Sequence, residues 1–236
     1  MDETDIRFRI AAARRILFRN GCDSGTAGHV SVRADGEDAF YVTPFQSFAE
    51  TLPADVVKVS FALETLEGDR TVSPAVAFHA AIYEARPDVR SVIHHHGHYV
   101  SVLATTGQVI GQYNIASSLF FEEQALTDDD DAGSAVDSER LPLALGADNH
   151  VVLIKNHGCV VVGETLEETT VKALTLEQSA RYHFEALLIG GTELSKQHAL
   201  EYKYNFNLYF VPEMWGAEFR KLRGSDPDLY ESLLNP

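Results

Sequence analysis

The chain has 236 residues, 45% of them hydrophobic, which suits one α/β domain with a sizeable core better than two domains. It carries 35 acidic residues against 19 Lys and Arg, a formal charge of −16. Such a surface repels phosphate backbones and anionic lipid headgroups, so we expect neither a nucleic-acid nor a membrane partner. The acidic start has no signal-peptide pattern, and Cys22 and Cys159 form no disulfide framework, so we expect a cytoplasmic protein.

The predicted elements alternate between helices and strands along one uninterrupted chain. Residues 5–20 form an amphipathic helix, and a glycine-rich loop follows at 24–28. Apolar, β-branched runs predict strands at 29–32, 39–43, 55–61, 89–95, 150–154 and 159–162. Further helices are expected after Pro74 and over 98–106, 138–145 and 165–188, with Thr165 and Glu168 forming a capping box. Residues 63–71 are turn-rich, and 108–112 and 113–119 are extended. We predict a single domain over 1–236, with a helical tail from about 191.

An acidic run lies at 128–131. A calcium loop of the hand-shaped type needs alternating ligands and a distal Glu, and this run has neither. We therefore predict a solvated loop.

A histidine-rich stretch closes the strand predicted at 89–95. Because side chains on a strand alternate between faces, His94 and His96 project to one side and His95 to the other. A catalytic zinc site keeps about three protein ligands and an open position. We predict His157, in an Asn-His-Gly turn framed by apolar strands, as the third ligand; the alternative is that these are ordinary polar histidines at a strand end.

Several segments together resemble the class II aldolase/adducin family over about residues 5–190. The segments are Gly25–Ser31, Thr43-Pro44, His79–Val89, His94–His96 and 156–158 with 161–165. The resemblance implies a three-layer α/β/α domain with a central, largely antiparallel sheet. It implies one divalent metal ion per chain on His94, His96 and His157, either zinc or iron(II), with manganese or cobalt as further options. It also implies a homotetramer with the site near a subunit boundary.

The departures from the aldolase pattern bear on chemistry. Ala75 stands where the aldolases carry a proton-transferring Glu, and a methyl group cannot move a proton. This absence is shared with the adducin-like subgroup. Only Ser73 remains of the hydroxyls that bind a substrate phosphate, His29 replaces the Asn of the phosphate loop, and Phe45 replaces a small polar residue. Since a phosphate needs several convergent donors, we predict a non-phosphorylated, partly aromatic or apolar substrate.

The missing carboxylate leaves the catalytic group open. His29 is one candidate, with hydrogen bonding inside its own loop as the alternative. Glu123, or its neighbour Glu122, is another, because this region in related folds approaches the site from a neighbouring subunit; the alternative is that both are surface carboxylates. Metal-bound water is a further candidate. The residues expected to bind substrate are Gly28, Thr43, Ser73 and His79, with core packing as the alternative for His79.

Three functions fit this pattern. The first is a metal-dependent lyase that cleaves a C–C bond in a 2-oxo or 2-hydroxy carbonyl substrate. The second is an iron(II) oxygenase that shortens the side chain of an aromatic 2-oxo or 2-hydroxy acid, as is understood for relatives in aminocoumarin antibiotic pathways. The third is a non-catalytic adducin-like module. Imidazole binds zinc and iron alike, so the ligand types do not separate the first two.

Overall fold

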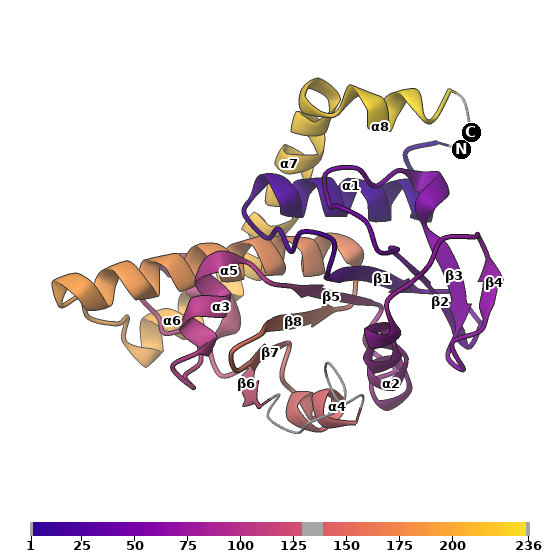
Figure 1. The fold of residues 1–236 in the computed structure, drawn as a ribbon. Coiled ribbons are helices and arrows are strands. Elements are labelled where there is room, and N and C mark those ends of the chain that lie inside the picture. Colours follow the sequence, from indigo (N-terminus) through magenta and orange to yellow (C-terminus); the bar gives the residue numbers. More distant parts are fainter. Residues whose placement is uncertain (1, 129–138, 235–236) are drawn as a thin grey trace.

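A central sheet of eight strands, in the order β4-β3-β2-β1-β5-β8-β7-β6, organises the protein (Figure 1). The computed structural model describes residues 2–128 and 139–234. The strands are β1 (His29–Arg33), β2 (Ala39–Val42), β3 (Val57–Ser60), β4 (Thr65–Glu67), β5 (Ser91–His95), β6 (Gln124–Thr127), β7 (Val151–Ile154) and β8 (Gly158–Gly163). Neighbouring strands are antiparallel, apart from the parallel pair β6 and β7. The predicted largely antiparallel sheet is confirmed.

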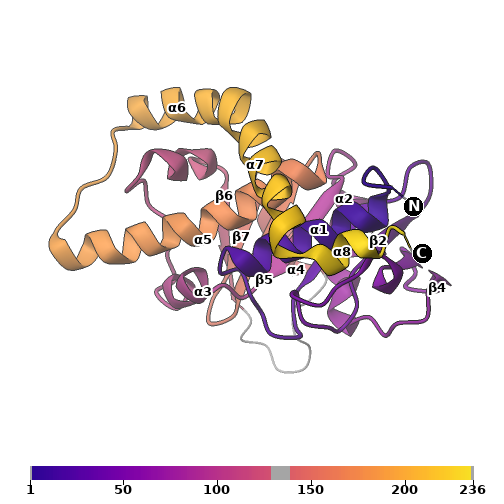
Figure 2. The same ribbon diagram turned by 90° about the horizontal axis from the view of Figure 1, so that it is seen from above.

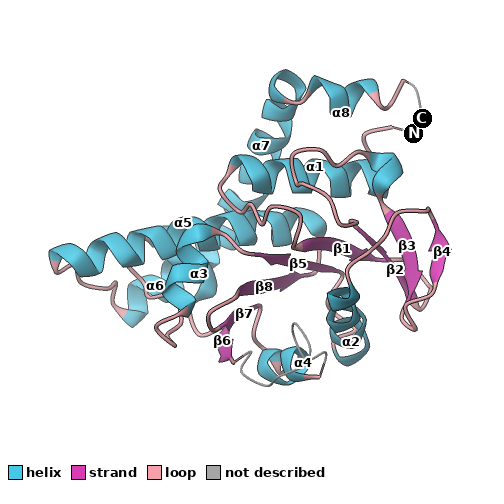
Figure 3. Ribbon diagram, viewed as in Figure 1, coloured by secondary structure: helices cyan, strands magenta, loops and turns pink. Residues whose placement is uncertain are grey.

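Helices cover both faces of the sheet (Figure 3). They are α1 (Ile6–Arg19), α2 (Ala77–Ala85), α3 (His98–Ala104), α4 (Arg140–Leu145), α5 (Leu166–Ile189), α6 (Lys196–Asn205), α7 (Val211–Ser225) and α8 (Pro227–Glu231). One core joins α1, α3, α5 and α7 to one face of the sheet, and a second joins α2 and α4 to the other. The predicted three-layer α/β/α architecture is therefore also confirmed.

Strand β5 lies in the middle of the sheet and is buried along its whole length. Its side chains alternate between the two cores: Val92 packs on the α2 and α4 side, and Ile93 on the α1 and α5 side. The same alternation carries His94 to the α2 side and His95 to the α5 side. The strand thus separates two adjacent histidines into different environments.

Three local elements differ from the sequence prediction. Residues Ile115–Phe120, expected to be extended, form a 3₁₀ helix, because the Asn114 side chain caps it by accepting a hydrogen bond from the backbone N of Ser117 at 2.8 Å. Strand β4 lies within the turn-rich segment, and β6 was not predicted. Both are edge strands whose residues are exposed or half-buried, so neither has the apolar run by which a buried strand is recognised.

Of the acidic run, only Asp128 falls within the described residues, so the loop predicted for the rest of the run lies outside them. In the described part of the chain, no helix combines the length and apolarity needed to cross a bilayer.

The C-terminal helices return to the N-terminal helix. After α6 and a π-helical turn at Phe206–Phe210, α7 crosses the layer and α8 lies along α1 (Figure 2). Asp226, between α7 and α8, is buried and accepts hydrogen bonds from Arg19 Nε at 2.6 Å and Arg15 Nη1 at 3.3 Å. This contact joins the C-terminal tail to helix α1.

We expect Asp226→Asn to lower the free energy of unfolding by about 1–3 kcal/mol, since it weakens charge-assisted bonds in a buried setting. Burial alone would raise the pKa of Asp226, but hydrogen bonds from Arg19 and Ser225 bring it below its ordinary value of 3.8. A depressed pKa stabilises the fold above the ordinary value, and that stabilisation disappears as pH falls through the depressed one. Urea titrations of both proteins should therefore differ at pH 7 and converge only once the pH has fallen below the depressed pKa of Asp226.

The matched control is Asp228→Asn. Asp228 also pairs with Arg15, at 2.6 Å, but its side chain is 55% exposed, so we expect a change below about 1 kcal/mol. Equal effects of the two substitutions would contradict a special role of the buried contact.

Candidate metal centre

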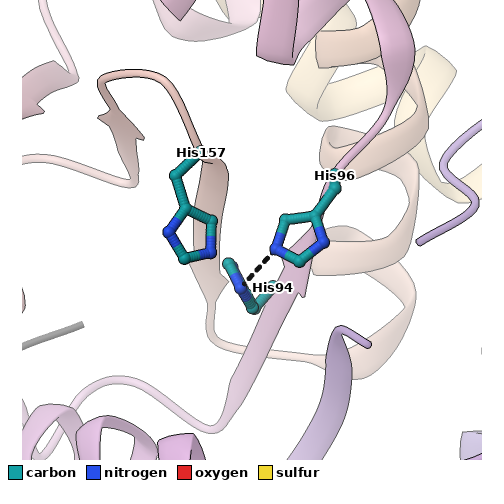
Figure 4. A group of neighbouring side chains, drawn as sticks. All are labelled: His94, His96 and His157. Atoms are coloured by element: carbon teal, nitrogen blue, oxygen red, sulfur yellow. Dashed lines mark hydrogen bonds between the residues drawn. The ribbon is translucent and has the colours of Figure 1, made fainter. Parts of the chain in front are cut away.

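Three imidazoles converge where β5 ends and β7 turns into β8 (Figure 4). His94 is on β5, His96 follows that strand, and His157 is in the turn between β7 and β8. Their ring centroids are 4.6 Å apart for His94 and His96, 5.2 Å for His94 and His157, and 4.8 Å for His96 and His157. One nitrogen from each ring lies within 4.8 Å of the other two. The structure therefore brings together the three side chains that the sequence singles out.

The turn that carries His157 has a demanding backbone. Asn156 takes a φ of +59°, a left-handed conformation that Asn tolerates better than most residues. At Gly158 a Cβ would lie 2.5 Å from the carbonyl oxygen of His95 and 2.7 Å from Cδ2 of His96. Glycine is therefore needed for β8 to start this close to the end of β5.

Hydrogen bonds fix the orientation of the other two ligands. His94 Nδ1 lies 2.9 Å from the carbonyl oxygen of Cys159, so this nitrogen carries the proton and donates it. The Nε2 of His94 then presents its lone pair toward His96 Nε2, 2.9 Å away. The backbone N of His96 donates to Ser24 Oγ at 2.7 Å. A cation bound between these two nitrogens would take the place of the hydrogen bond that joins them.

Burial also sets the charge state of the cluster. It brings the pKa of His94 well below its ordinary value, and the neighbouring histidines add to the effect. Burial, with His157 nearby, lowers the pKa of His96 to about 4. Neutral imidazoles are what a metal ion requires, so the donor set fits a divalent cation such as zinc or iron(II).

His29 lies beside the cluster on the same face of the sheet. It is directly opposite His94 in the β1–β5 register, and the two ring centroids are 5.6 Å apart. Burial lowers the pKa of His29 well below its ordinary value, and among the described residues its buried Nδ1 has no hydrogen-bond partner. His29 is thus a neutral group with a free polar atom next to the three ligands.

His79 lies behind His29, away from the three ligands. It is fully buried on α2, with its ring 5.4 Å from that of His29 and Nδ1 2.7 Å from Ser31 Oγ, which also bonds Tyr83 Oη at 2.7 Å. The structure thus brings His79 to His29 and not to the ligand set.

The other residues predicted to bind substrate are Gly28, in the loop before β1, Thr43, which contacts β1, and Ser73, which precedes α2. Gly28, with φ +81°, lies so close to β5 that a Cβ would be 2.8 Å from the His94 carbonyl oxygen. The hydroxyl of Thr43 accepts from the backbone N of Val30 at 3.1 Å, and that of Ser73 from Ala75 N at 3.2 Å. Both residues are buried.

Sequence reasoning missed Arg14, which holds these loops together. Its buried guanidinium donates to the carbonyl oxygens of Pro44 at 3.1 Å, Gln46 at 2.7 Å and Gly28 at 3.5 Å. Burial lowers its pKa to about 9, although Asp55 and Asp23 favour the charged form. The only hint of this role in the sequence is that Arg14 lies within the apolar stretch of the first helix. The three carbonyl groups that it binds are 14 to 32 residues further along the chain, so a local pattern does not identify them.

Glu123 lies at the opposite end of the strands from His157 within this chain. It precedes β6, whose Gln124 pairs with Val151 at the start of β7, whereas His157 follows the end of β7. At about 3.3 Å per residue, β7 separates the two by roughly 10 Å or more. Burial opposes ionisation, but contacts with His150 at 2.9 Å and Lys203 at 2.6 Å lower the pKa of Glu123 to about 2. The structure therefore does not bring Glu123 to the cluster within one chain.

Comparisons with known proteins agree with the fold. Residues 8–184 match the family described as Class II Aldolase and Adducin N-terminal domain, and the chain belongs to this family. The L-fuculose 1-phosphate aldolase from Glaciozyma antarctica PI12 has a similar fold: the TM-score is 0.83 over 94% of this chain and 90% of that one, at 23% sequence identity.

Two curated relatives come from Streptomyces. This chain is 33% identical over 195 residues to a 4-hydroxy-3-prenylphenylpyruvate oxygenase/4-hydroxy-3-prenylbenzoate synthase of Streptomyces roseochromogenus subsp. oscitans, covering 80% of this chain and 70% of that protein. It is 36% identical over 169 residues to Decarboxylase NovR of Streptomyces niveus, covering 69% of this chain and 62% of that protein.

We expect Gly158→Ala to lower stability by about 1–3 kcal/mol, because the added methyl forces apart two packed strand ends. Since His96 must move, affinity for Zn²⁺ should fall as well, which a chelator competition would measure. Gly224→Ala in α7 is the control, because a Cβ there meets nothing within 4 Å. Unaltered zinc affinity in Gly158→Ala would contradict the close fit at the turn.

Proposed function

We propose that this protein is a divalent-metal-dependent enzyme that cleaves a C–C bond in a non-phosphorylated 2-oxo or 2-hydroxy carbonyl substrate, in the manner of an aldolase-like lyase. The observation that carries the proposal is the convergence of the imidazoles of His94, His96 and His157, beside a buried nitrogen of His29 that has no hydrogen-bond partner among the described residues. A non-catalytic module has no evident need for such a costly group of polar side chains, of which His29 and His94 are buried and His96 and His157 half-buried.

The three ligands would hold one ion, zinc or iron(II) first, with manganese and cobalt as further options. When bound, such an ion supplies a Lewis acid that polarises a carbonyl or hydroxy-acid oxygen. His29, next to His94, would orient the substrate through Nδ1. Its depressed pKa suits a neutral imidazole that takes up a proton only transiently. His79 and Ser31, bonded to each other behind it, would keep the His29 ring in place.

The surroundings of the cluster favour a substrate without a phosphate. The guanidinium of Arg14, which donates to Gly28 in the loop before β1, is fully buried and also donates to two other loop carbonyls and to Thr51. Phe45, 50% exposed, lies in the segment after Thr43 where a substrate's apolar part can pack. Gly28, Thr43 and Ser73 would then shape the pocket mainly through backbone and hydroxyl contacts.

A second candidate is an iron(II) oxygenase acting on an aromatic 2-oxo or 2-hydroxy acid. The names of the two Streptomyces relatives, an oxygenase on a prenylated phenylpyruvate and a decarboxylase, favour it. Such a reaction does not need the proton-transferring carboxylate that Ala75 replaces. The lyase and the oxygenase share the ligand set and differ in the metal and in the use of dioxygen.

We further propose that the protein forms a homo-oligomer, with a tetramer as the expected form. The end of α5 exposes Leu187, Leu188 and Ile189 at 54%, 72% and 86%, more apolar surface than a solitary helix end normally leaves in water. In such an assembly Glu123 of a neighbouring copy is the remaining candidate for a catalytic carboxylate. A cytoplasmic location stays a prediction.

Protein purified without added metal should contain about one divalent ion per chain by elemental analysis. We expect His157→Ala to lose that ion while its far-UV circular dichroism stays unchanged, because the ring lies in a turn outside both cores. His198→Ala, on the exposed face of α6, should retain the ion. A wild-type protein that stays empty when zinc, iron, manganese and cobalt are each supplied would favour the adducin-like module instead.

The two catalytic candidates separate in one pair of assays. With 4-hydroxyphenylpyruvate as probe, iron(II)-loaded protein should consume dioxygen in step with substrate loss if it is an oxygenase. A lyase should form its cleavage products from 2-oxo or 2-hydroxy substrates under argon, with zinc as the ion. Metal-loaded protein that is inactive in both assays across a panel of aromatic and aliphatic 2-oxo and 2-hydroxy acids would contradict the proposed substrate class.

A further inference from the structure

Helix α3 begins two residues after His96, so the position of its first turn determines where that ligand lies. A carboxylate on α5 holds this turn. Glu177 Oε1 accepts from the backbone N of Tyr99 at 2.8 Å, and Oε2 accepts from that of Val100 at 2.9 Å. Glu177 is only 5% exposed. One buried side chain thus satisfies two amides that a helix start otherwise leaves without an intrahelical partner.

Gly97, between His96 and the helix, is in close contact with the same carboxylate. A Cβ at Gly97 would lie 2.5 Å from Glu177 Oε2 and 2.8 Å from its Cδ. The backbone N of Gly97 donates to His95 Nδ1 at 3.1 Å. The link between ligand and helix is therefore held from the α5 side by two buried groups, neither of which belongs to the ligand set.

The same helix also contacts a second ligand. The hydroxyl of Ser101, one turn into α3, donates to the carbonyl oxygen of His157 at 3.1 Å. The backbone N of Ser101 donates to the carbonyl oxygen of Gly97 at 3.0 Å. A shift of the first turn of α3 would accordingly displace the backbone at His96 and at His157 together.

We propose that Glu177 is a positioning residue of the metal centre: by holding the first turn of α3 it sets the separation of His96 and His157. This inference rests on the proposed metal-dependent function. Groups behind the ligands commonly tune a metal site, and their removal costs about 10–100-fold in metal affinity. Nothing in the spacing of the histidine motif points to Glu177, because it lies about 80 residues further along the chain.

The substitution that isolates this role is Glu177→Gln. Glutamine has nearly the same shape, but it offers one acceptor oxygen and places an NH₂ donor against the second backbone N–H. We expect the Co²⁺ dissociation constant, from competition with a chelator, to rise about 10–100-fold. We also expect the visible absorption bands of bound Co²⁺ to shift, because the ligand geometry changes.

The matched control is Glu168→Gln, in the first turn of the same helix. Glu168 also accepts from a backbone amide, that of Glu164 at 3.3 Å, and pairs with Lys172 at 2.6 Å. Its Co²⁺ affinity and spectrum should stay within about twofold of wild type, well short of the 10–100-fold expected above. Urea unfolding of both apo variants separates loss of fold from loss of positioning.

The outcomes are distinct. If Glu177→Gln lowers stability while Co²⁺ affinity and spectrum stay at wild-type values, the carboxylate is only structural and the proposal is wrong. If Glu177→Gln does not fold, Ser101→Ala takes its place: a several-fold weaker affinity with an altered spectrum supports the proposal, and wild-type behaviour overturns it. Wild-type protein that binds no Co²⁺ would overturn the metal-dependent function itself, an outcome visible before any variant is made.

Discussion

The alternation of side chains along one buried strand is the constraint on which the site depends. Because β5 is packed on both faces, His94 must face the layer of α2 and His95 the layer of α5. His94 thereby meets His29, His96 and His157, while His95 bonds the backbone of Gly97 and lies 3.2 Å from the sulfur of Cys159. A slip of one residue in the register of β5 would exchange these roles and dismantle the cluster.

Five histidines form a continuous group rather than an isolated set of three: His29, His79 and His94 are buried, and His96 and His157 are half-buried. His79 touches His29, His29 touches His94, and His94 faces His96 and His157. Burial lowers the pKa of each of the first three, so His79, His29 and His94 are neutral before any ion is bound. Neutral imidazoles tolerate burial far better than cations do, and they are also the form that a metal ion binds. The same physical condition therefore serves folding and the proposed chemistry.

The loss of a carboxylate at Ala75 changes what the cluster can do. In the aldolase pattern a Glu there moves the proton, whereas here the polar atom next to the ligands belongs to His29. This exchange replaces a charged base with a neutral group that holds a proton poorly. We therefore expect the reaction to depend on the metal ion together with either a group from a neighbouring copy or dioxygen, rather than on a carboxylate base at position 75.

Local sequence determined a large part of this protein: the main helices and buried strands, the family, and the pairing of His94 with His96 on one face, because period-two and helical patterns are visible within a few residues. It also pointed to His157, through an Asn-His-Gly turn between two apolar strands. The edge strands β4 and β6 escaped it, because their half-exposed residues become strands only by pairing with a neighbour. Only the tertiary structure decided that Arg14 binds the loop carbonyls, that Glu177 holds the helix after His96, and that Glu123 lies at the far end of the strands. Each of these depends on segments that are distant in the chain and meet only when the layers pack, and no local pattern records such a meeting.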